Sequence, residues 1–259
     1  MSEARPAPPQ TPPQSPSQDR AGSPTVAAFR LLLLNLVTRA RVLSLGALGV
    51  VAVILGIALR FNPGDDPANT ASKLIVDGYC LSLLVPVTAL VFASAALGDL
   101  AEDGTLVYLW LKPVARWKLV AAAFAATLCI ALPVAVLPTT IAAAVSDTGS
   151  ALTGGALAGT ALATLGYVAV FLGLGLLVRR ALAWGLAYIL IWEGAVSRVA
   201  RGAARASIQV YARSLFAHLG DRPDPKFSAA LSTSLIAVIV VAVVALGLTV
   251  WLLARDEVP

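Results

Sequence analysis

The 259-residue chain is 58% apolar and only 13% charged, with a formal net charge of +5 and a mean hydropathy of +0.84. Soluble domains are nearer about 45–50% apolar and 25% charged, so this composition excludes a water-soluble globule and indicates an integral membrane protein. The basic pI near 9.6 does not point to nucleic acid, because basic residues of membrane chains mainly set topology and contact anionic lipid.

The chain begins with a tail rich in Pro, Ser, Gln and Ala. Residues 1–24 hold seven of the sixteen prolines and show no apolar periodicity, so they cannot bury enough surface to fold. We therefore expect a disordered cytoplasmic tail. Arginines interrupt the apolar stretch at residues 25–41, which predicts a short helix in the membrane interface.

Residues 25–259 are predicted to form one all-α transmembrane domain, because six apolar segments are long enough to cross a bilayer at a rise of about 1.5 Å per residue. The predicted spans lie at about residues 42–59, 78–97, 119–145, 152–178, 181–197 and 229–253. Pro133 and Pro138 predict a kink or a break in the third span. Only Arg179 and Arg180 join the fourth span to the fifth.

The orientation follows from the numbers of Lys and Arg on each side of the membrane. With a cytoplasmic N-terminus the inner side carries eleven and the outer side eight, of which six lie in residues 198–226. The other short loops carry the inside bias. We therefore expect a multi-pass protein of the inner or plasma membrane with both termini in the cytoplasm.

The segment 198–226 is unusually basic for an outer loop. Arg198, Arg201 and Arg205 lie at i, i+3 and i+7, and an apolar stripe follows at helical spacing, which predicts an amphipathic helix in or re-entering the outer interface. The stripe consists of Ile208, Tyr211, Leu215 and Leu219. Two hypotheses remain: a helix that only connects two spans, or a re-entrant gate over a translocation path to which Arg198 and Arg201 belong.

The sequence contains none of the motifs of metalloproteases, serine hydrolases or P-loop nucleotide hydrolases. The one histidine, His218, lies in the outer segment, where a surface role is commoner than catalysis. Cys80 and Cys129 lie in apolar runs as packing residues, and one histidine with two separated cysteines cannot build a metal site. We expect a non-catalytic subunit that binds no cofactor or metal itself.

The passage between the second and third predicted spans has the most specific pattern. Gly98 is expected to end the incoming helix, and Asp99 and Glu102 have the N-cap and N3 spacing that starts a new one. An apolar face that includes Trp110 follows, and Pro113 ends the segment. The pattern predicts a short amphipathic helix on the cytoplasmic surface, although composition alone favours an interfacial connector.

This passage resembles the first cytoplasmic loop of the membrane subunits of type-2 ATP-binding-cassette (ABC) transporters. That loop carries an acidic pair, Gly-Thr-Leu, a Leu-rich patch and Pro-Val-x-Arg. The corresponding elements are Glu102-Asp103, Gly104-Thr105-Leu106, Leu109 to Leu111, and Pro113-Val114-Ala115-Arg116. A Lys that the family commonly carries beyond the Arg is missing, since alanines occupy residues 121–123.

The resemblance implies a permease that pairs with a second permease copy, as a homodimer or heterodimer, and docks on a separate ABC ATPase subunit through this loop, the coupling helix. ATP and Mg would then be bound by the ATPase, and transport would be export. The implied coupling residues are Glu102, Asp103, Gly104, Thr105, Leu106, Pro113 and Arg116, with Arg179 and Arg180 as a second contact. The family also has a helical pair entering from outside before the last span, which suits residues 198–227.

Glu193 is a candidate for the translocation path, because an intramembrane acid is by default a functional candidate. It is placed near the outer end of the fifth predicted span, and interfacial pairing with Arg198 is the competing hypothesis. Two other function classes compete with the permease: an ion-driven secondary transporter or channel, and a non-transporting membrane anchor or assembly factor. The former requires several ionisable groups near the midplane, where the sequence indicates chiefly Glu193.

Overall fold

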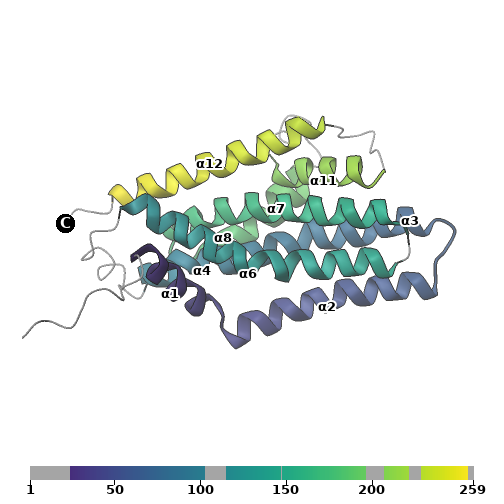
Figure 1. Cartoon of the computed structure of the whole chain (residues 1–259), viewed down its shortest axis with the longest axis horizontal. Helices are drawn as coiled ribbons and strands as arrows, with labels where there is room; N and C mark the ends of the chain where they lie inside the picture. The colour runs from purple at the N-terminus through teal and green to yellow at the C-terminus, as the bar shows by residue number, and fades with distance from the viewer. Residues whose placement is uncertain (1–23, 103–114, 147, 197–206, 222–228, 256–259) are drawn as a thin grey trace, which may run out of the picture.

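The computed structural model describes residues 24–102, 115–146, 148–196, 207–221 and 229–255, and these residues form a helical bundle without β-strands (Figure 1). Its helices are α1 (Pro24–Leu36), α2 (Arg39–Phe61), α3 (Pro67–Thr70), α4 (Val85–Glu102), α6 (Arg116–Val145), α7 (Ser150–Leu177), α8 (Ala181–Ala187), α11 (Ile208–Leu219) and α12 (Leu231–Arg255). Two stretches have the wider π-helical turn, η2 (Ala71–Leu84) and η3 (Tyr188–Val196). The predicted tail at residues 1–23 lies outside the described residues.

Five of the described helical stretches are long and apolar enough to cross a bilayer, and a sixth apolar helix at Ala181–Gly194 is shorter. The five are Arg39–Phe61, Pro67–Asp99, Arg116–Val145, Ser150–Leu177 and Leu231–Arg255. This confirms the predicted all-α integral membrane protein. The shorter helix is composed of α8 and η3, where an α-helical turn gives way to a π-helical one.

The bundle has two ends, which we name after the helices found there (Figure 1). The α1 end also holds the N-termini of α2, α6 and α8 and the C-termini of α4, α7 and α12. The α3 end holds the C-termini of α2 and α6 and the N-terminus of α7 (Figure 1). An ion pair joins Arg41 of α2 to Asp99 of α4 at the α1 end, with 2.8 Å between nitrogen and oxygen. At the α3 end, Arg60 donates to the Val145 carbonyl at 3.5 Å.

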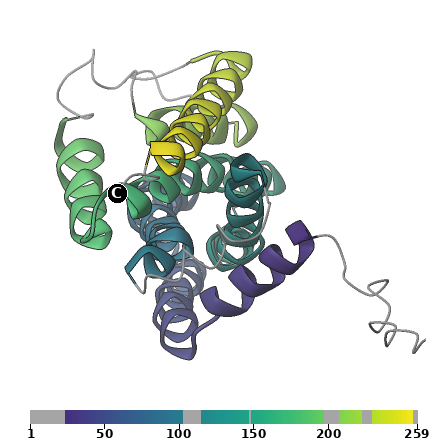
Figure 2. The same ribbon diagram turned by 90° about the vertical axis from the view of Figure 1, so that its left-hand side faces the viewer.

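Helix α1 is separate from α2 and lies across the α1 end (Figure 2). The extended backbone of Thr38, with ψ of 141°, breaks the chain direction between the two helices. Leu32 and Leu36 of α1 are buried, and the helix packs on α6 and α4. It is thus a surface helix with one covered face, as expected of a helix in the membrane interface.

The helix formed by η2 and α4 continues through Gly98 and Asp99 to Glu102, so the predicted helix stop at Gly98 and the capping role of Asp99 are wrong. A Cβ on Gly98 would lie only 3.0 Å from the carbonyl oxygen of Gly175. Gly98 therefore allows α4 and α7 to approach closely rather than ending a helix. The carboxylate of Asp99 is paired with Arg41 instead of capping a helix N-terminus.

Helix α6 is continuous across Pro133 and Pro138, so the predicted alternative of a break does not occur. Each proline removes one backbone hydrogen bond, which a membrane helix tolerates where neighbouring helices pack against it. Pro138 lies against Gly49 of α2, where a Cβ would come within 2.7 Å of the proline Cγ. The glycine thus makes room for the proline ring.

Helix α7 is the central helix of the bundle and packs against α4, α6, α11 and α12 (Figure 1). Two of its threonine hydroxyls are satisfied locally: Thr160 donates to the Ala156 carbonyl at 2.6 Å, and Thr164 to the Thr160 carbonyl at 2.7 Å. By contrast, α12 exposes an apolar face. That face consists of Ile236, Ile239, Val240, Val243, Val244 and Leu248. The core therefore surrounds α7, and α12 lies at its edge.

Candidate functional site

The structure describes the two edges of the predicted coupling helix. Glu102 is the last residue of α4 and Arg116 the first of α6, so the loop begins and ends at the α1 end (Figure 1). Five of its proposed contact residues, Asp103, Gly104, Thr105, Leu106 and Pro113, lie outside the described residues. Their roles stay predictions.

Basic residues gather at the α1 end. Arg179 and Arg180 are exposed between α7 and α8, at the same end as Arg116. The described Lys and Arg residues of this end are Arg30, Arg39, Arg41, Arg116, Lys118, Arg179, Arg180 and Arg255, against Arg60, Lys73 and Arg213 in the half of the bundle nearest the α3 end. The two predicted contact regions, the loop and Arg179-Arg180, therefore lie on one side of the bundle.

Tryptophans mark the same end as a membrane boundary. The indoles of Trp117, Trp184 and Trp251 are exposed, and each lies near the terminus of its helix at the α1 end. The guanidinium of Arg255 lies 3.8 Å from the ring centroid of Trp251, and the Lys118 ammonium 5.6 Å from that of Trp117. Rings of this kind beside cations are typical of the level of lipid headgroups.

The root of the coupling loop is held from two sides. Asp99, in the last turn of α4, pairs with Arg41 of α2, and the two side chains are 36% and 27% exposed. On its other side the same turn packs on α7 through the contact between Gly98 and Gly175. A force applied to the loop therefore reaches α2 and α7 as well as α4.

Removing the carboxylate in Asp99→Asn is expected to lower stability by about 0.5–1 kcal/mol, because a partly exposed ion pair contributes little. The thermal unfolding midpoint of the purified chain should fall by about 1–3 °C. Arg39→Gln, at an exposed residue on the same end of α2, is the matched control and should change little. The exchange Arg41→Asp with Asp99→Arg should recover the midpoint, and failure to recover would contradict the pairing.

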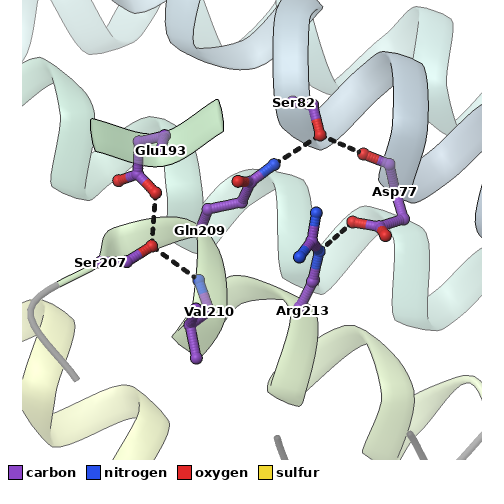
Figure 3. Close-up of polar contacts among 7 residues, drawn as sticks. All are labelled: Asp77, Ser82, Glu193, Ser207, Gln209, Val210 and Arg213. Atoms are coloured by element: carbon purple, nitrogen blue, oxygen red, sulfur yellow. Dashed lines mark hydrogen bonds and ion pairs between the residues drawn. The ribbon is translucent and has the colours of Figure 1, made fainter. Parts of the chain in front are cut away.

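A second candidate site lies inside the bundle where η2, η3 and α11 meet (Figure 3). We call it the polar seam, and it comprises Asp77, Ser82, Glu193, Ser207, Gln209 and Arg213. Of these six residues only Glu193 is singled out by its position in the sequence. The contacts of Gln209 with Ser82 and of Arg213 with Asp77 join residues 127 and 136 positions apart in the chain, so no local pattern indicates them.

Two contacts of the polar seam join α11 to η2. The Arg213 guanidinium donates to the Asp77 carboxylate, and the Gln209 amide donates to the Ser82 hydroxyl at 2.6 Å (Figure 3). The Ser82 hydroxyl in turn donates to the Asp77 carbonyl at 2.7 Å. Because Gln209 and Arg213 are four residues apart on α11, both face the same neighbour.

The third contact joins α11 to η3. Glu193 is only 2% exposed, and its carboxylate accepts hydrogen bonds from the Ser207 hydroxyl and, at 3.3 Å, from the Tyr188 hydroxyl. Ser207 also caps α11 by accepting from the Val210 amide at 3.3 Å. Glu193 thus lies buried in the bundle, whereas Arg198, its predicted partner, and Arg201 lie outside the described residues.

The π-helical turns place these polar groups. Ser82 bonds the carbonyl five residues back, and Tyr188 and Glu193 are also five residues apart. In an α-helix a serine hydroxyl reaches three or four residues back, and positions five apart lie about 140° around the axis. The wider π turn, which bonds residues five apart and is frequent at functional sites, brings them together.

Helix α11 lies inside the bundle along the half of α7 nearest the α3 end (Figure 1). Positions on α7 run opposite to those on α11: a Cβ on Gly166 would meet Ile208, and one on Gly155 would meet Gly220. Of the two hypotheses for the outer segment, this packing favours re-entry. Its buried residues include Gln209 and Ser214, which a helix lying flat in the interface would leave in water.

A large part of the chain matches one known protein family. Residues 37–199, more than half of the sequence, match the family described as ABC-2 family transporter protein. The matched range starts just before α2, contains the whole predicted coupling helix and ends beyond η3. A comparison with curated proteins found none that matches the chain.

Proposed function

The chain belongs to the ABC-2 family of transporter proteins, and on this premise we propose that it couples ATP hydrolysis by a separate ATPase subunit to the export of a substrate. Membership of this family makes the chain a multi-pass membrane permease of an ABC transporter that works with an ABC ATPase subunit. It also favours the permease over the ion-driven transporter and the membrane anchor. The direction of transport and the coupling route are part of the proposal.

The observation that carries the coupling route is the arrangement at the α1 end. Of the helices that flank the loop, α4 ends and α6 begins there, and Arg179 and Arg180 are exposed at the same end. We place the ATPase on this surface, in contact with the loop residues Asp103, Gly104, Thr105, Leu106 and Pro113. ATP and Mg²⁺ are bound by the ATPase in this proposal.

The distribution of charge supports a cytoplasmic α1 end. Eight described basic residues lie at this end and three, Arg60, Lys73 and Arg213, in the half nearest the α3 end, which is the bias expected of the cytoplasmic side. Both chain termini then face the cytoplasm. A second permease copy completes the transporter in this proposal, and the exposed apolar faces of α2 and α12 are available to lipid or to that copy.

One continuous helix connects the proposed ATPase contact with the polar seam. The stretch from Pro67 to Glu102 carries Asp77 and Ser82 in the half nearer the α3 end and the root of the predicted coupling loop at its α1 end. A rigid helix that is moved at one end displaces groups at its other end. Movement of the docked ATPase therefore reaches the seam without passing through any intervening loop.

The coupling proposal is tested with Glu102→Arg and with Gly104→Pro together with Thr105→Pro. Both variants are expected to insert normally but to retain about tenfold less ATPase on co-purification, because they change the charge or the backbone of the docking loop. Asp65→Arg, at an exposed residue of the α3 end, is the matched charge control. Equal recovery of the ATPase and equal ATP hydrolysis in all variants would refute the coupling assignment.

A further inference from the structure

We propose that the polar seam is the surface along which the permease opens at the α3 end, with α7 and α11 pivoting as one body away from η2 about the close contact of α7 with α4 at Gly98 and Gly175. This inference rests on the proposed transport function, and it assigns the moving parts. The seam is closed in the structure described, where Gln209 and Arg213 of α11 contact Ser82 and Asp77 of η2 (Figure 3).

The contact between α7 and α11 is built to stay closed. A Cβ on Gly155 would lie 2.7 Å from the Gly220 nitrogen, and one on Gly159 would lie 3.0 Å from the Ala212 carbonyl oxygen. Two helices whose backbones meet at glycines pack in direct contact. No long side chain lies between them that could change its rotamer and keep the contact if the helices moved apart. These two helices therefore move together.

Helix α11 is also tied to α12 through a short polar contact. The Ser214 hydroxyl donates to the Ala229 carbonyl and accepts from the Ala229 amide, both at 2.9 Å. Ala229 lies two residues before the start of α12. The tie extends the moving body from α7 and α11 to the start of α12.

The contacts between α11 and η2 have the opposite character. They are made by the ends of long, rotatable side chains, Arg213 and Gln209, on their partners Asp77 and Ser82. While the seam is dry, an unpaired charge there would be costly, so the pairs hold it shut. When water or polar substrate groups enter the seam, these side chains can hydrogen-bond to them instead of to each other, at little cost in free energy. The seam therefore has two stable arrangements.

The three contacts are ordered from the α3 end inward. Along α11 they fall at Arg213, Gln209 and Ser207, and the last lies at the start of the helix, beside the middle of α7. Exposure decreases in the same direction: Asp77 is 29% and Arg213 17% exposed, whereas Glu193 is 2% exposed. Opening thus starts at the ion pair of Asp77 with Arg213 and proceeds to Glu193.

The test uses Ser82→Cys as a reporter in a chain that carries Cys80→Ala and Cys129→Ala, reconstituted in vesicles. A membrane-impermeant methanethiosulfonate reagent is added from the α3 side. In this background Arg213→Glu places a second carboxylate opposite that of Asp77, so the ion pair is replaced by repulsion. This variant is expected to raise the labelling rate of the reporter thiol about tenfold. Adding Asp77→Arg to Arg213→Glu restores an opposite pair and should return the rate to that of the reporter chain.

Lys73→Glu is the matched control, because this exposed residue of η2 changes the charge near the α3 end outside the seam. An unchanged labelling rate in a monodisperse Arg213→Glu chain, or a rise that the exchanged pair does not reverse, would overturn the proposal. The labelling needs no ATPase. A negative labelling result therefore does not bear on the coupling proposal. Equally, unchanged ATPase recovery in the coupling-loop variants does not bear on the labelling result.

Discussion

Gly175→Val is expected to prevent the chain from folding, whereas Gly154→Val on the same helix is expected to leave it intact. A Cβ on Gly175 would lie 2.5 Å from the Ser94 carbonyl oxygen and 2.8 Å from its Cα. These are backbone atoms of α4, so the two helices would have to separate. Overpacking typically costs about 1–3 kcal/mol and occasionally more, and the clash with backbone atoms places this variant at the upper end, a large part of a stability of about 5–15 kcal/mol.

The measurements for this pair are the yield of monodisperse protein in detergent and its thermal unfolding midpoint. At Gly154 a Cβ would meet nothing within 4 Å, and valine is a better helix former than glycine, so the control should fold normally. Gly175→Ala is expected to fall between the two. Equal yields of the Gly175→Val and Gly154→Val chains would show that α4 and α7 do not approach as closely as the structure describes.

Glu193→Leu is expected to have the second largest effect, because it removes the acceptor of one buried and one partly buried donor. The hydroxyls of Ser207 and Tyr188 both donate to this carboxylate, and each buried donor left without a partner costs about 1–3 kcal/mol. The thermal midpoint should fall by about 5–10 °C, and ATP hydrolysis dependent on the permease should fall about tenfold, since the seam would no longer close correctly.

Two further variants distinguish a role of Glu193 in the seam from general damage to the core. Glu193→Gln keeps one acceptor oxygen and should lose less than Glu193→Leu in both measurements. Ser234→Ala removes a buried hydroxyl of α12 that makes no hydrogen bond within the described residues, and it should be nearly neutral. A Glu193→Leu chain as stable and as active as the Ser234→Ala chain would exclude Glu193 from the gate.

The sequence alone was sufficient for the class of fold, because the class depends on composition and on the length of apolar runs. It also indicated the separate helix before α2, where arginines interrupt an apolar stretch, and the family, whose loop motif is local in the chain. Each of these features is encoded by neighbouring residues. The family match and the helices of the structure confirm them.

The features that could not be predicted depend on partners that are distant in the chain. Glycine followed by an acidic residue is a sound signal for a helix end, yet at Gly98 and Asp99 the helix continues, because Gly175 and Arg41 lie opposite them. The polar seam could not be predicted from the sequence for the same reason and for one more. Its pairs are 136 and 127 residues apart, and the π-helical turns shift side chains away from the faces that a period of about 3.6 predicts.

The short length of α11 has a consequence for the order in which the protein is assembled. Twelve residues span only about 18 Å, well short of the roughly 30 Å of a bilayer's hydrocarbon, and α11 carries Arg213, whose insertion alone is unfavourable. During biosynthesis this helix cannot enter the membrane by itself. It joins the bundle after η2 with Asp77 and α7 with Gly155 and Gly159 are in place. The part of the chain made later therefore packs onto helices made earlier.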